Sequence, residues 1–255
     1  MGSATGPENV CNMWYDHYRT LFNSVPSSHD FNADFIRTHC DFVNDNNDVI
    51  TSNEVHSIIS HMAGGKAADH FGLQLEHYRF ASSNFFVVLS LCFSSMFCHG
   101  YMPKGSAHSV ISPVVKDKSG DISDSANYRP IALVTIFSKI LEHIIVSRVD
   151  KYLVDTHNQF GFKKHHGTLM PVLILKDIIN FYISHGSNMH LAFIDDSRAF
   201  DRVRYDTLFI KLYKFIPGVT LRLIIVWYAG QTAGILWDGI MSDVFPVCNG
   251  VRQGG

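Results

Sequence analysis

Cysteine is scarce in this sequence, and the cysteines present are not spaced as a structural framework requires. The 255 residues contain five cysteines, an odd number, and no two of them form a Cys-x-x-Cys pair. The fifteen histidines also lack the spacing of zinc ligands. The composition therefore argues against a disulfide-built domain or a structural zinc site. It favours a reducing intracellular compartment, either the cytoplasm or the nucleus.

Long hydrophobic runs are also missing. The most apolar stretch, Phe85 to Phe97, spans thirteen residues and is interrupted by serines, whereas a helix that crosses a bilayer needs about 20 residues. The first twenty residues do not show the basic and then apolar pattern of a signal peptide. We therefore expect no membrane partner, and we predict that the apolar stretch forms a buried helix.

A strong charge of one sign is absent, since 21 basic and 23 acidic side chains give a net charge of −2. The charges are nevertheless unevenly distributed. Residues 1–58 hold eight acidic and two basic side chains, whereas residues 198–222 hold six basic and two acidic ones. A local basic cluster in a near-neutral chain fits an anionic ligand such as nucleic acid, but a solvated helix face explains it equally well.

The sequence does contain helical and strand patterns in a mixed order. Apolar residues recur at helical spacing in 9–25, 51–62, 71–96, 134–153, 169–182, 206–215 and 221–228. Strand patterns occur in 109–115 and 190–194, a hairpin is predicted in 235–245 with its turn at Asp238-Gly239, and the polar stretch 26–48 indicates a loop or linker. Helices first, then isolated strands, then helices between strands predict an α+β fold.

Several single residues refine these predictions. Thr51 or Ser52 is the expected N-cap of the second helix, with Glu54 in the position of a capping box. Pro113 argues for an edge position of its strand because proline has no N–H to donate. Pro130 is expected in the first turn of the helix that follows it.

Two adjacent carboxylates, Asp195 and Asp196, follow the predicted buried strand 190–194. Such charges are costly unless a positive group compensates them. Because neighbouring side chains of a strand point to opposite faces, only one of the pair can face a given site. Magnesium prefers oxygen ligands, so Asp195 is the candidate ligand and Asp196 offers its backbone carbonyl. The competing interpretation is that one of them N-caps a helix around 197–200.

The segment FIDDSRAFDRV, residues 193–203, resembles the first catalytic motif of reverse transcriptases from non-LTR (LINE-type) retrotransposons, which reads F-x-D-x-x-K-A-F-D-x-V. Arg198 stands in place of the usual lysine. The matching residues are Phe193, Asp195, Ala199, Phe200, Asp201 and Val203.

Other segments resemble the same family in the same order. Residues 127–142, NYRPIALVTIFSKILE, are similar to its N-Y-R-P-I-S-L block and the following S-K-I-x-E. Residues 157–168 resemble the Q-F-G-F-R block, and residues 249–255, NGVRQGG, resemble the start of the next motif, G-V-x-Q-G. Residues 66–73, KAADHFGL, resemble K-A-P-G-P-D-G-L more weakly, because both prolines and the acidic residue are missing.

The resemblance implies nucleotide transfer assisted by two Mg²⁺ ions, with Mn²⁺ as a possible substitute. Asp195 would bind both ions, and the backbone of Asp196 would help to hold the ion on the nucleotide side. Asp201 is expected to stabilise the turn rather than to bind metal. The implied partners are an RNA template, a DNA primer and a dNTP. Lys163 and Lys164 would contact template phosphates, although a solvated loop is an equal alternative.

The resemblance also implies a nucleotide site. Phe200 would be the aromatic ring that excludes a 2′-hydroxyl, and Arg129 would contact the triphosphate. Lys116 is a candidate for the γ-phosphate. Gln253 and Gly254 would contact the template and nucleotide, with the glycine allowing close backbone approach. The plainer alternatives are a core ring for Phe200, a structural ion pair for Arg129, an exposed loop lysine for Lys116 and a simple turn for Gly254.

The expected architecture is that of a right-handed polymerase, with mainly helical fingers and a short antiparallel palm sheet. Residues 1–54 would precede the polymerase, 55–190 would form the fingers with the first palm elements, and 191–255 a partial palm. The family's second carboxylate motif, an aromatic residue, any residue and Asp-Asp, does not occur after Gln253 in the 255 residues. We therefore expect this chain to lack polymerase activity. The alternative is a non-enzymatic retrotransposon remnant or an RNA-binding module, and the sequence leaves the oligomeric state open.

Overall fold

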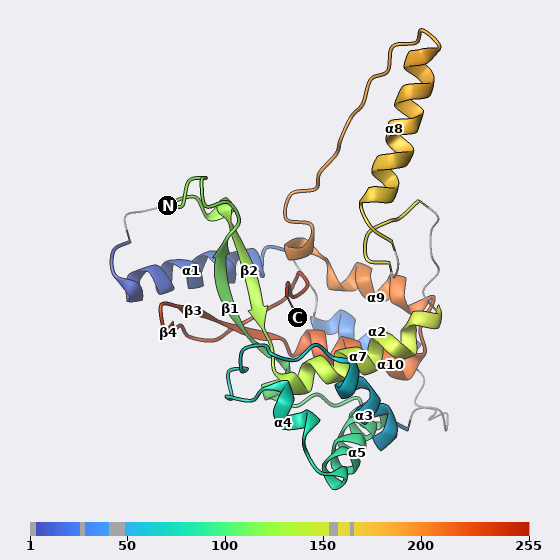
Figure 1. Cartoon of the computed structure of the whole chain (residues 1–255). Coiled ribbons are helices and arrows are strands. Elements are labelled where there is room, and N and C mark those ends of the chain that lie inside the picture. Colours follow the sequence, from blue (N-terminus) through green and yellow to red (C-terminus); the bar gives the residue numbers. More distant parts are fainter. Residues whose placement is uncertain (1–3, 26–28, 41–48, 153–157, 164–165, 255) are drawn as a thin grey trace. The chain divides into compact units, whose positions relative to one another are not determined.

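The computed structural model describes residues 4–25, 29–40, 49–152, 158–163 and 166–254 (Figure 1). The chain divides into two units, the first formed by residues 1–150 with 198–255 and the second by residues 151–197. The first unit contains a small sheet and most of the described helices. The fold is therefore mixed α and β, as the sequence predicted.

The sheet is built around β1 (His108–Val115), which lies between β2 (Tyr128–Leu133) and β3 (Thr232–Trp237). β3 also pairs with the short strands β4 (Ile240–Met241) and β5 (Phe245–Pro246). β2 is antiparallel to β1, but β3 is parallel to it. The prediction of an antiparallel sheet is therefore wrong for the pair of β1 and β3. Parallel strands need a long crossover connection, which the helices between β2 and β3 provide.

Two prolines mark the place where the sheet opens. Pro113 on β1 faces Pro130 on β2, and the parallel register between β1 and β3 stops at Ile111. Beyond Ile111, β1 has β2 on one side only among the described strands and is an edge strand. Pro113 lies in this part of β1, as predicted, because proline has no N–H to donate to a further strand. Pro130 was expected in the first turn of a helix. It lies in a strand instead, and the helix α7 (Ile136–Val149) begins six residues later.

The helix α1 (Pro7–Leu21) packs against the sheet through an aromatic stripe (Figure 1). Trp14 and Tyr18 are four residues apart on one face of α1 and are both 2% exposed. The ring of Trp14 lies 4.6 Å from that of Tyr128 on β2, and both helix residues belong to one core cluster with Ile235. Buried rings of this size dominate the energy of a small core. The predicted helix in 9–25 is thus confirmed and is an integral part of the first unit.

The other helices of the first unit enclose a second apolar core, in which Phe97, Leu141 and Leu221 have no exposed surface. These helices are α2 (His29–His39), α3 (Ser52–His61), α4 (Leu75–Arg79), α5 (Ser83–His99), α6 (Lys104–Ala107), α7, α9 (Tyr205–Tyr213) and α10 (Gly218–Ala229). α2 falls within 26–48, so the prediction of a loop there was wrong for His29–His39. Its apolar residues are few, but Phe35 is buried in this core.

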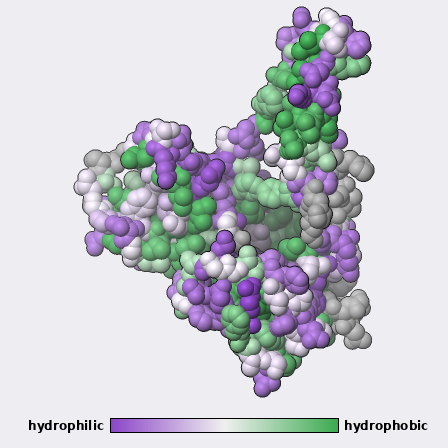
Figure 2. All heavy atoms as spheres, viewed as in Figure 1, coloured by the Kyte–Doolittle hydropathy of each residue, from purple (hydrophilic) through white to green (hydrophobic). Residues whose placement is uncertain are grey.

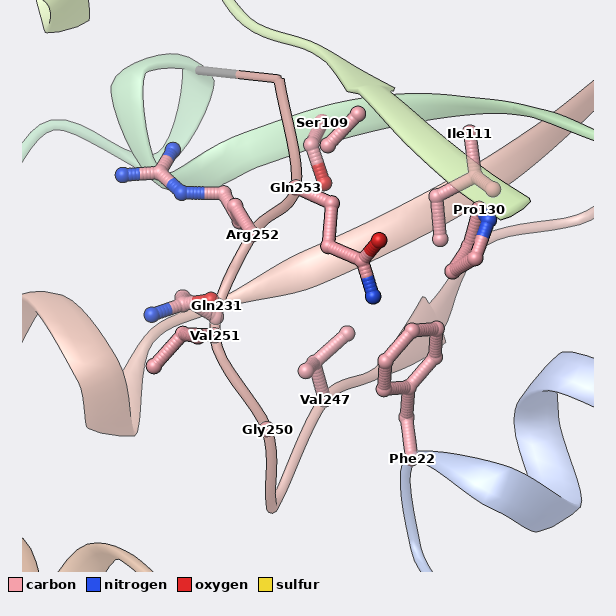
Figure 3. Close-up of a pocket in the computed structure, with 11 residues that line it drawn as sticks. Phe22, Ser109, Ile111, Pro130, Gln231, Val247, Gly250, Val251, Arg252 and Gln253 are labelled. Carbon is pink, nitrogen blue, oxygen red and sulfur yellow. The ribbon is translucent and has the colours of Figure 1, made fainter. Parts of the chain in front are cut away.

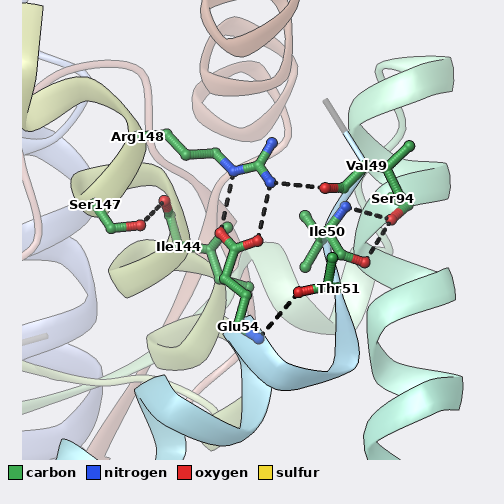
Figure 4. A network of polar contacts seen from close by, with 8 residues as sticks. All are labelled: Val49, Ile50, Thr51, Glu54, Ser94, Ile144, Ser147 and Arg148. Atoms are coloured by element: carbon green, nitrogen blue, oxygen red, sulfur yellow. Dashed lines mark hydrogen bonds and ion pairs between the residues drawn. The ribbon is translucent and has the colours of Figure 1, made fainter. Parts of the chain in front are cut away.

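The start of α3 is tied to the end of α7 (Figure 4). Thr51 is the N-cap of α3, because its Oγ1 accepts a hydrogen bond from the Glu54 backbone N–H at 3.2 Å. The Glu54 carboxylate does not return to the cap. It accepts two hydrogen bonds, of 3.2 and 3.1 Å, from the guanidinium of Arg148. Arg148 also donates to the Val49 carbonyl at 3.1 Å, so one side chain joins three segments.

The second unit contains α8 (Leu169–Ser184), a helix without a buried residue. Large hydrophobic side chains along it are exposed, and Figure 2 shows hydrophobic residues gathered on the segment labelled α8 in Figure 1. Across both units, none of the described helices is long and apolar enough to cross a membrane.

The predicted buried strand 190–194 is wrong, because these residues form neither a strand nor a helix and are exposed. Phe193 is 83% and Ile194 is 97% exposed. A strand is stable only when its backbone groups pair with another strand, and no described strand pairs with this segment. Its apolar pattern therefore has no partner that would bury it.

Candidate functional site

Two segments that are fifty residues apart in the sequence meet in the first unit. The turn that carries Phe200 is a short 3-10 helix, Phe200–Arg202. The Val251 N–H donates to the Phe200 carbonyl at 2.8 Å, and the Gly250 N–H donates to the Val203 carbonyl at 2.9 Å. The end of the first-motif segment therefore lies directly against the segment 249–254.

The same segment continues onto the edge of β2. The Gln253 carbonyl accepts a hydrogen bond from the Ala132 N–H at 2.7 Å, and Gln253 forms a parallel bridge with Ile131. Gly254 has a φ of +87°, and a Cβ at this position would lie 3.1 Å from the Ile131 side chain. Arg129 is two residues from Ile131 on β2, so the two share one face of the strand. The geometry brings Arg129, Gln253 and Gly254 to one edge of the sheet.

The side chain of Gln253 is held by Asp201. The Gln253 Nε2 donates to the Asp201 Oδ1 at 2.6 Å, and Asp201 is only 6% exposed. Burial raises the pKa of Asp201, while the hydrogen bond from Gln253 and the charges of Arg198 and Lys116 oppose that shift. Burial and the nearby Asp201 charge also raise the pKa of Tyr18. The expectation that Asp201 stabilises its turn is consistent with these contacts.

A small pocket lies beside Gln253 (Figure 3). Its walls come from the end of α1, from β1 and β2, and from residues 250–253. In Figure 3 the Gln253 side chain points into this pocket, toward Pro130, Val247 and Phe22. The amide of Gln253 is therefore packed between the sheet and the end of α1 as well as hydrogen-bonded to Asp201.

The two candidate phosphate ligands differ in their surroundings. Arg129 is exposed on β2, and its guanidinium makes no hydrogen bond or ion pair with any residue that the structure describes. The alternative of a structural ion pair therefore finds no support there. Lys116 is exposed at the end of β1, and its Nζ donates to the Ala126 carbonyl at 2.6 Å. Phe200 is 46% exposed, so it is not a fully buried core ring.

The candidate metal ligands lie in the second unit. Asp195 and Asp196 are exposed and outside regular secondary structure. The following 3-10 helix is capped by Ala199, whose side chain makes no capping bond, so neither aspartate caps a described helix. Among the described residues, no three His, Cys, Asp or Glu side chains are close enough to hold a metal ion together. Lys163 is half-buried in this unit, and Lys164 lies outside the described residues.

The family follows from a comparison with known proteins. The model of the family described as "Reverse transcriptase (RNA-dependent DNA polymerase)" matches residues 115–255, more than half of the chain. The chain belongs to the reverse transcriptase family. The matched range contains β2, the Phe200 turn and the Gln253 segment, so the contacts between them lie in the reverse transcriptase region.

Relatives of this reverse transcriptase chain come from retrotransposons. The RNA-directed DNA polymerase from mobile element jockey of Drosophila melanogaster is 29% identical over 213 residues, which are 80% of this chain and 23% of the relative. The Drosophila funebris jockey protein is 28% identical over 214 residues, 81% and 23% of the two chains. The probable polymerase from transposon X-element of Drosophila melanogaster is 25% identical over 206 residues, 79% and 22%. The chain thus spans less than a quarter of their length.

The structure also reveals residues to which the sequence assigned no role. Asn249 is completely buried and hydrogen-bonds to the backbone of both α1 and the Phe200 turn. Arg252 forms an ion pair with Glu142 on α7 at 2.6 Å. The reverse transcriptase motifs contained Glu142 as a matching letter, but no sequence pattern indicated which residue it would meet. The one available signal was a polar Asn249 beside Gly250, a combination that is typical of a tight turn.

Proposed function

We propose that this chain forms the nucleotide- and template-binding part of an RNA-directed DNA polymerase of a LINE-type retrotransposon. One observation carries the proposal: the Phe200 turn and the Gln253 segment meet at the edge of β2, beside the exposed Arg129. In this assignment residues 55–190 are the fingers with the first palm elements, and 191–255 are part of the palm. Residues 1–54 contribute the N-terminal helix.

The incoming nucleotide would lie along this edge of the sheet. Arg129 has a guanidinium without a partner among the described residues, and a planar donor of fixed charge suits a triphosphate. Lys116, whose Nζ donates to the Ala126 carbonyl in this structure, would contact the γ-phosphate. The half-exposed ring of Phe200 would lie under the sugar and exclude a 2′-hydroxyl. Gln253 and Gly254 would contact the base pair, with the glycine allowing close approach.

The metal would be held by the first-motif aspartates. Asp195 and Asp196 offer exposed carboxylate and carbonyl oxygens, the ligand type that Mg²⁺ and Mn²⁺ prefer. These residues fit a two-metal site only in part. Among the described residues, no third acidic or histidine ligand lies close to them. When bound, the metal ions supply charge stabilisation for the attacking and leaving oxygens. Asp195 would act as the direct ligand and Asp196 through its carbonyl.

The partners that this function requires are an RNA template, a DNA primer and a dNTP. Lys163 and Lys164 are candidates for contacts with template phosphates. Removing a contact of this kind weakens binding about equally for all sequences, and the contribution of the contact to binding decreases with added salt.

The test measures binding, which does not depend on completion of the reaction. A photoreactive dNTP is cross-linked to the 255-residue chain in the presence of an RNA–DNA primer–template and Mn²⁺. We expect saturable labelling that Arg129→Gln reduces about tenfold, the loss of one good charged contact. The control is Arg37→Gln, which removes an exposed arginine of α2 and leaves labelling unchanged. Labelling that is equal in both variants, or RNA binding without nucleotide labelling, would contradict the proposal and favour an RNA-binding module.

The metal-binding role of Asp195 has its own test. Mn²⁺ binding to the wild-type chain and to Asp195→Asn is followed by electron paramagnetic resonance. We expect Asp195→Asn to weaken Mn²⁺ binding in the presence of primer–template and dNTP, since an amide is a poorer ligand than a carboxylate. Unchanged Mn²⁺ binding in that variant would contradict the metal assignment.

A further inference from the structure

The buried side chain of Asn249 makes three hydrogen bonds to the backbone. Its Nδ2 donates to the Leu21 carbonyl at 3.0 Å and to the Asp201 carbonyl at 2.8 Å. Its Oδ1 accepts from the Val25 N–H at 3.2 Å. Asn249 has no exposed surface, so leaving one of these groups without a partner would cost about 1–3 kcal/mol. The amide can therefore adopt only one orientation.

These bonds connect the end of α1 to the Phe200 turn. The backbone N–H groups of Cys248 and Asn249 both point to the Phe22 carbonyl, at 2.9 and 3.1 Å. On the other side, a Cβ on Gly250 would lie only 2.7 Å from the Asp201 carbonyl oxygen. The chain at 248–250 is thus enclosed between α1 and the turn, with no room for a larger residue at position 250.

Asp201 holds Gln253 in a similar way. The Gln253 amide has a donor end and an acceptor end, and a carboxylate can only accept. The 2.6 Å bond from Nε2 to the Asp201 Oδ1 therefore directs the donor end of the amide to Asp201. The backbone of Gln253 is fixed separately by the Ala132 N–H, so this bond decides only the direction of the side chain.

We propose that Asn249 and Asp201 are positioning residues for nucleotide selection: Asn249 fixes the turn that carries Phe200 against α1, and Asp201 fixes the amide of Gln253. Both side chains are buried, so they act through Phe200 and Gln253 and do not touch the substrate. This inference rests on the proposed nucleotide site. It goes beyond that site because it gives the N-terminal helix α1 a role in holding the Phe200 ring in position.

The proposal predicts a change in selectivity rather than a loss of fold. A misplacement of a reacting group by about 1 Å can cost roughly a hundredfold in rate. We therefore expect Asn249→Ala and Asp201→Ala to lower the ratio of dNTP to rNTP cross-linking about tenfold at a temperature where both variants remain folded. Asp201→Asn keeps an oxygen that can accept a hydrogen bond from Gln253, so this variant should retain most of the wild-type ratio. If the Asp201 carboxylate bound a metal ion instead, the ratio would fall in Asp201→Asn as well.

The matched control is Asn23→Ala. Asn23 also joins the end of α1 to the sheet, donating to the Arg19 and Pro246 carbonyls at 2.8 and 2.9 Å, but it is exposed and its side chain makes no hydrogen bond to the Phe200 turn among the described residues. It should leave the ratio unchanged. Thermal unfolding of every variant is followed by circular dichroism, and amide hydrogen exchange of residues 250–253 reports whether the segment has loosened.

The outcomes separate the two proposals. If the wild-type chain cross-links nucleotide and Asn249→Ala retains the wild-type dNTP to rNTP ratio, the positioning roles are wrong while the nucleotide site remains. If Asp201→Asn is as damaging as Asp201→Ala, the hydrogen-bond argument is wrong. If the wild-type chain itself takes up no nucleotide, the proposed function fails and the positioning roles fail with it.

Discussion

Arg252 and Glu142 form an ion pair that joins two of the family's sequence motifs. The Arg252 Nη2 donates to the Glu142 Oε1 at 2.6 Å, and the guanidinium lies 4.8 Å from the centre of the Trp227 ring. The side chain of Arg252 is 13% exposed and that of Glu142 is 33% exposed. The pair fixes the residue next to Gln253 to α7, while Trp227 belongs to α10. It therefore gives the segment 249–254 an attachment to α7 in addition to the bond between Gln253 and Asp201.

Removing the carboxylate of this pair should destabilise the first unit. In Glu142→Ala the mostly buried Arg252 loses its charged partner, and we expect the free energy of unfolding to fall by about 1–3 kcal/mol. Urea unfolding followed by tryptophan fluorescence measures the change, since Trp227 lies beside the pair. The control is Asp34→Ala, which removes the ion pair of Asp34 with Arg37, where both side chains are more than two-thirds exposed. An equal loss in both variants would contradict the argument.

The helices were largely predictable because their signals are local. The apolar spacing in 9–25, 169–182 and 221–228 predicted α1, α8 and α10, and the Thr51 cap of α3 is confirmed. The hairpin turn at Asp238-Gly239 is also confirmed, since both residues have positive φ between β3 and β4. Each of these features depends on a few neighbouring residues, and the chemistry of the side chains decides it.

The contacts of the candidate site were not predictable, because they depend on residues far apart in the chain. Gln253 and Asp201 are 52 residues apart, and Asn249 and Leu21 are 228 apart. The resemblance placed Phe200 and Gln253 in one site but assigned no role to Asn249. The strand predicted in 190–194 failed for the related reason that an apolar run becomes a strand only where another strand accepts it. Local pattern alone cannot supply that partner.

Gly250 should tolerate no side chain. It has a φ of +86°, and an added Cβ would lie 2.7 Å from the backbone oxygen of Asp201. Gly250→Ala combines the cost of a left-handed conformation with a clash against backbone, so we expect a loss of roughly 2–4 kcal/mol in the free energy of unfolding.

Gly239→Ala separates the two costs. Gly239 has a φ of +79° but no atom within 4 Å of an added Cβ, so only the conformational cost of about 1–2 kcal/mol applies. Chemical denaturation of the two variants gives the comparison. A Gly250→Ala protein that is as stable as Gly239→Ala would show that the turn can move away from the segment 249–254.

Asp201 should make stability depend on pH with an unusual sign. Its pKa is raised, first of all by burial, so the folded state holds the proton more tightly than the unfolded chain. Below the unfolded pKa of about 3.9 both states are protonated, and the stabilising contribution is fully present. As the pH rises through the folded pKa, this contribution is lost. Relative to Asp201→Asn, the wild-type chain should therefore become less stable from about pH 4 upward and then level off.

Asp117 provides a control of opposite sign. Its pKa is lowered by hydrogen bonds from the side chain and backbone of Ser119. Its contribution is present above the unfolded pKa and is lost as the pH falls through the folded one. Urea unfolding at several pH values should therefore give opposite slopes for the differences from Asp117→Asn and from Asp201→Asn. Parallel slopes would mean that the burial of Asp201 does not control its protonation.

The exposed apolar surface of α8 should bind hydrophobic dyes and promote self-association. Leu173, Ile174 and Phe181 are 48–58% exposed, within a helix that has no buried residue. Exposed apolar patches of more than a few hundred Å² are rare on monomeric proteins and favour association. Replacing Leu173 and Phe181 together by lysine keeps good helix propensity at position 173 and adds charge. We expect weaker fluorescence of an anilinonaphthalene sulfonate dye and a lower apparent mass in light scattering.

The control for this change is Val88→Lys on α5. Val88 is 56% exposed but lies on a helix whose opposite face is buried in the core of the first unit, so its replacement should leave dye binding nearly unchanged. Helix content, measured by circular dichroism, should be equal in the wild-type chain and both variants. If dye binding falls equally in both, the apolar surface is not concentrated on α8. If it rises in the α8 variant together with a loss of helix, the lysines have unfolded α8 and its apolar side chains stabilise the helix rather than attract a partner.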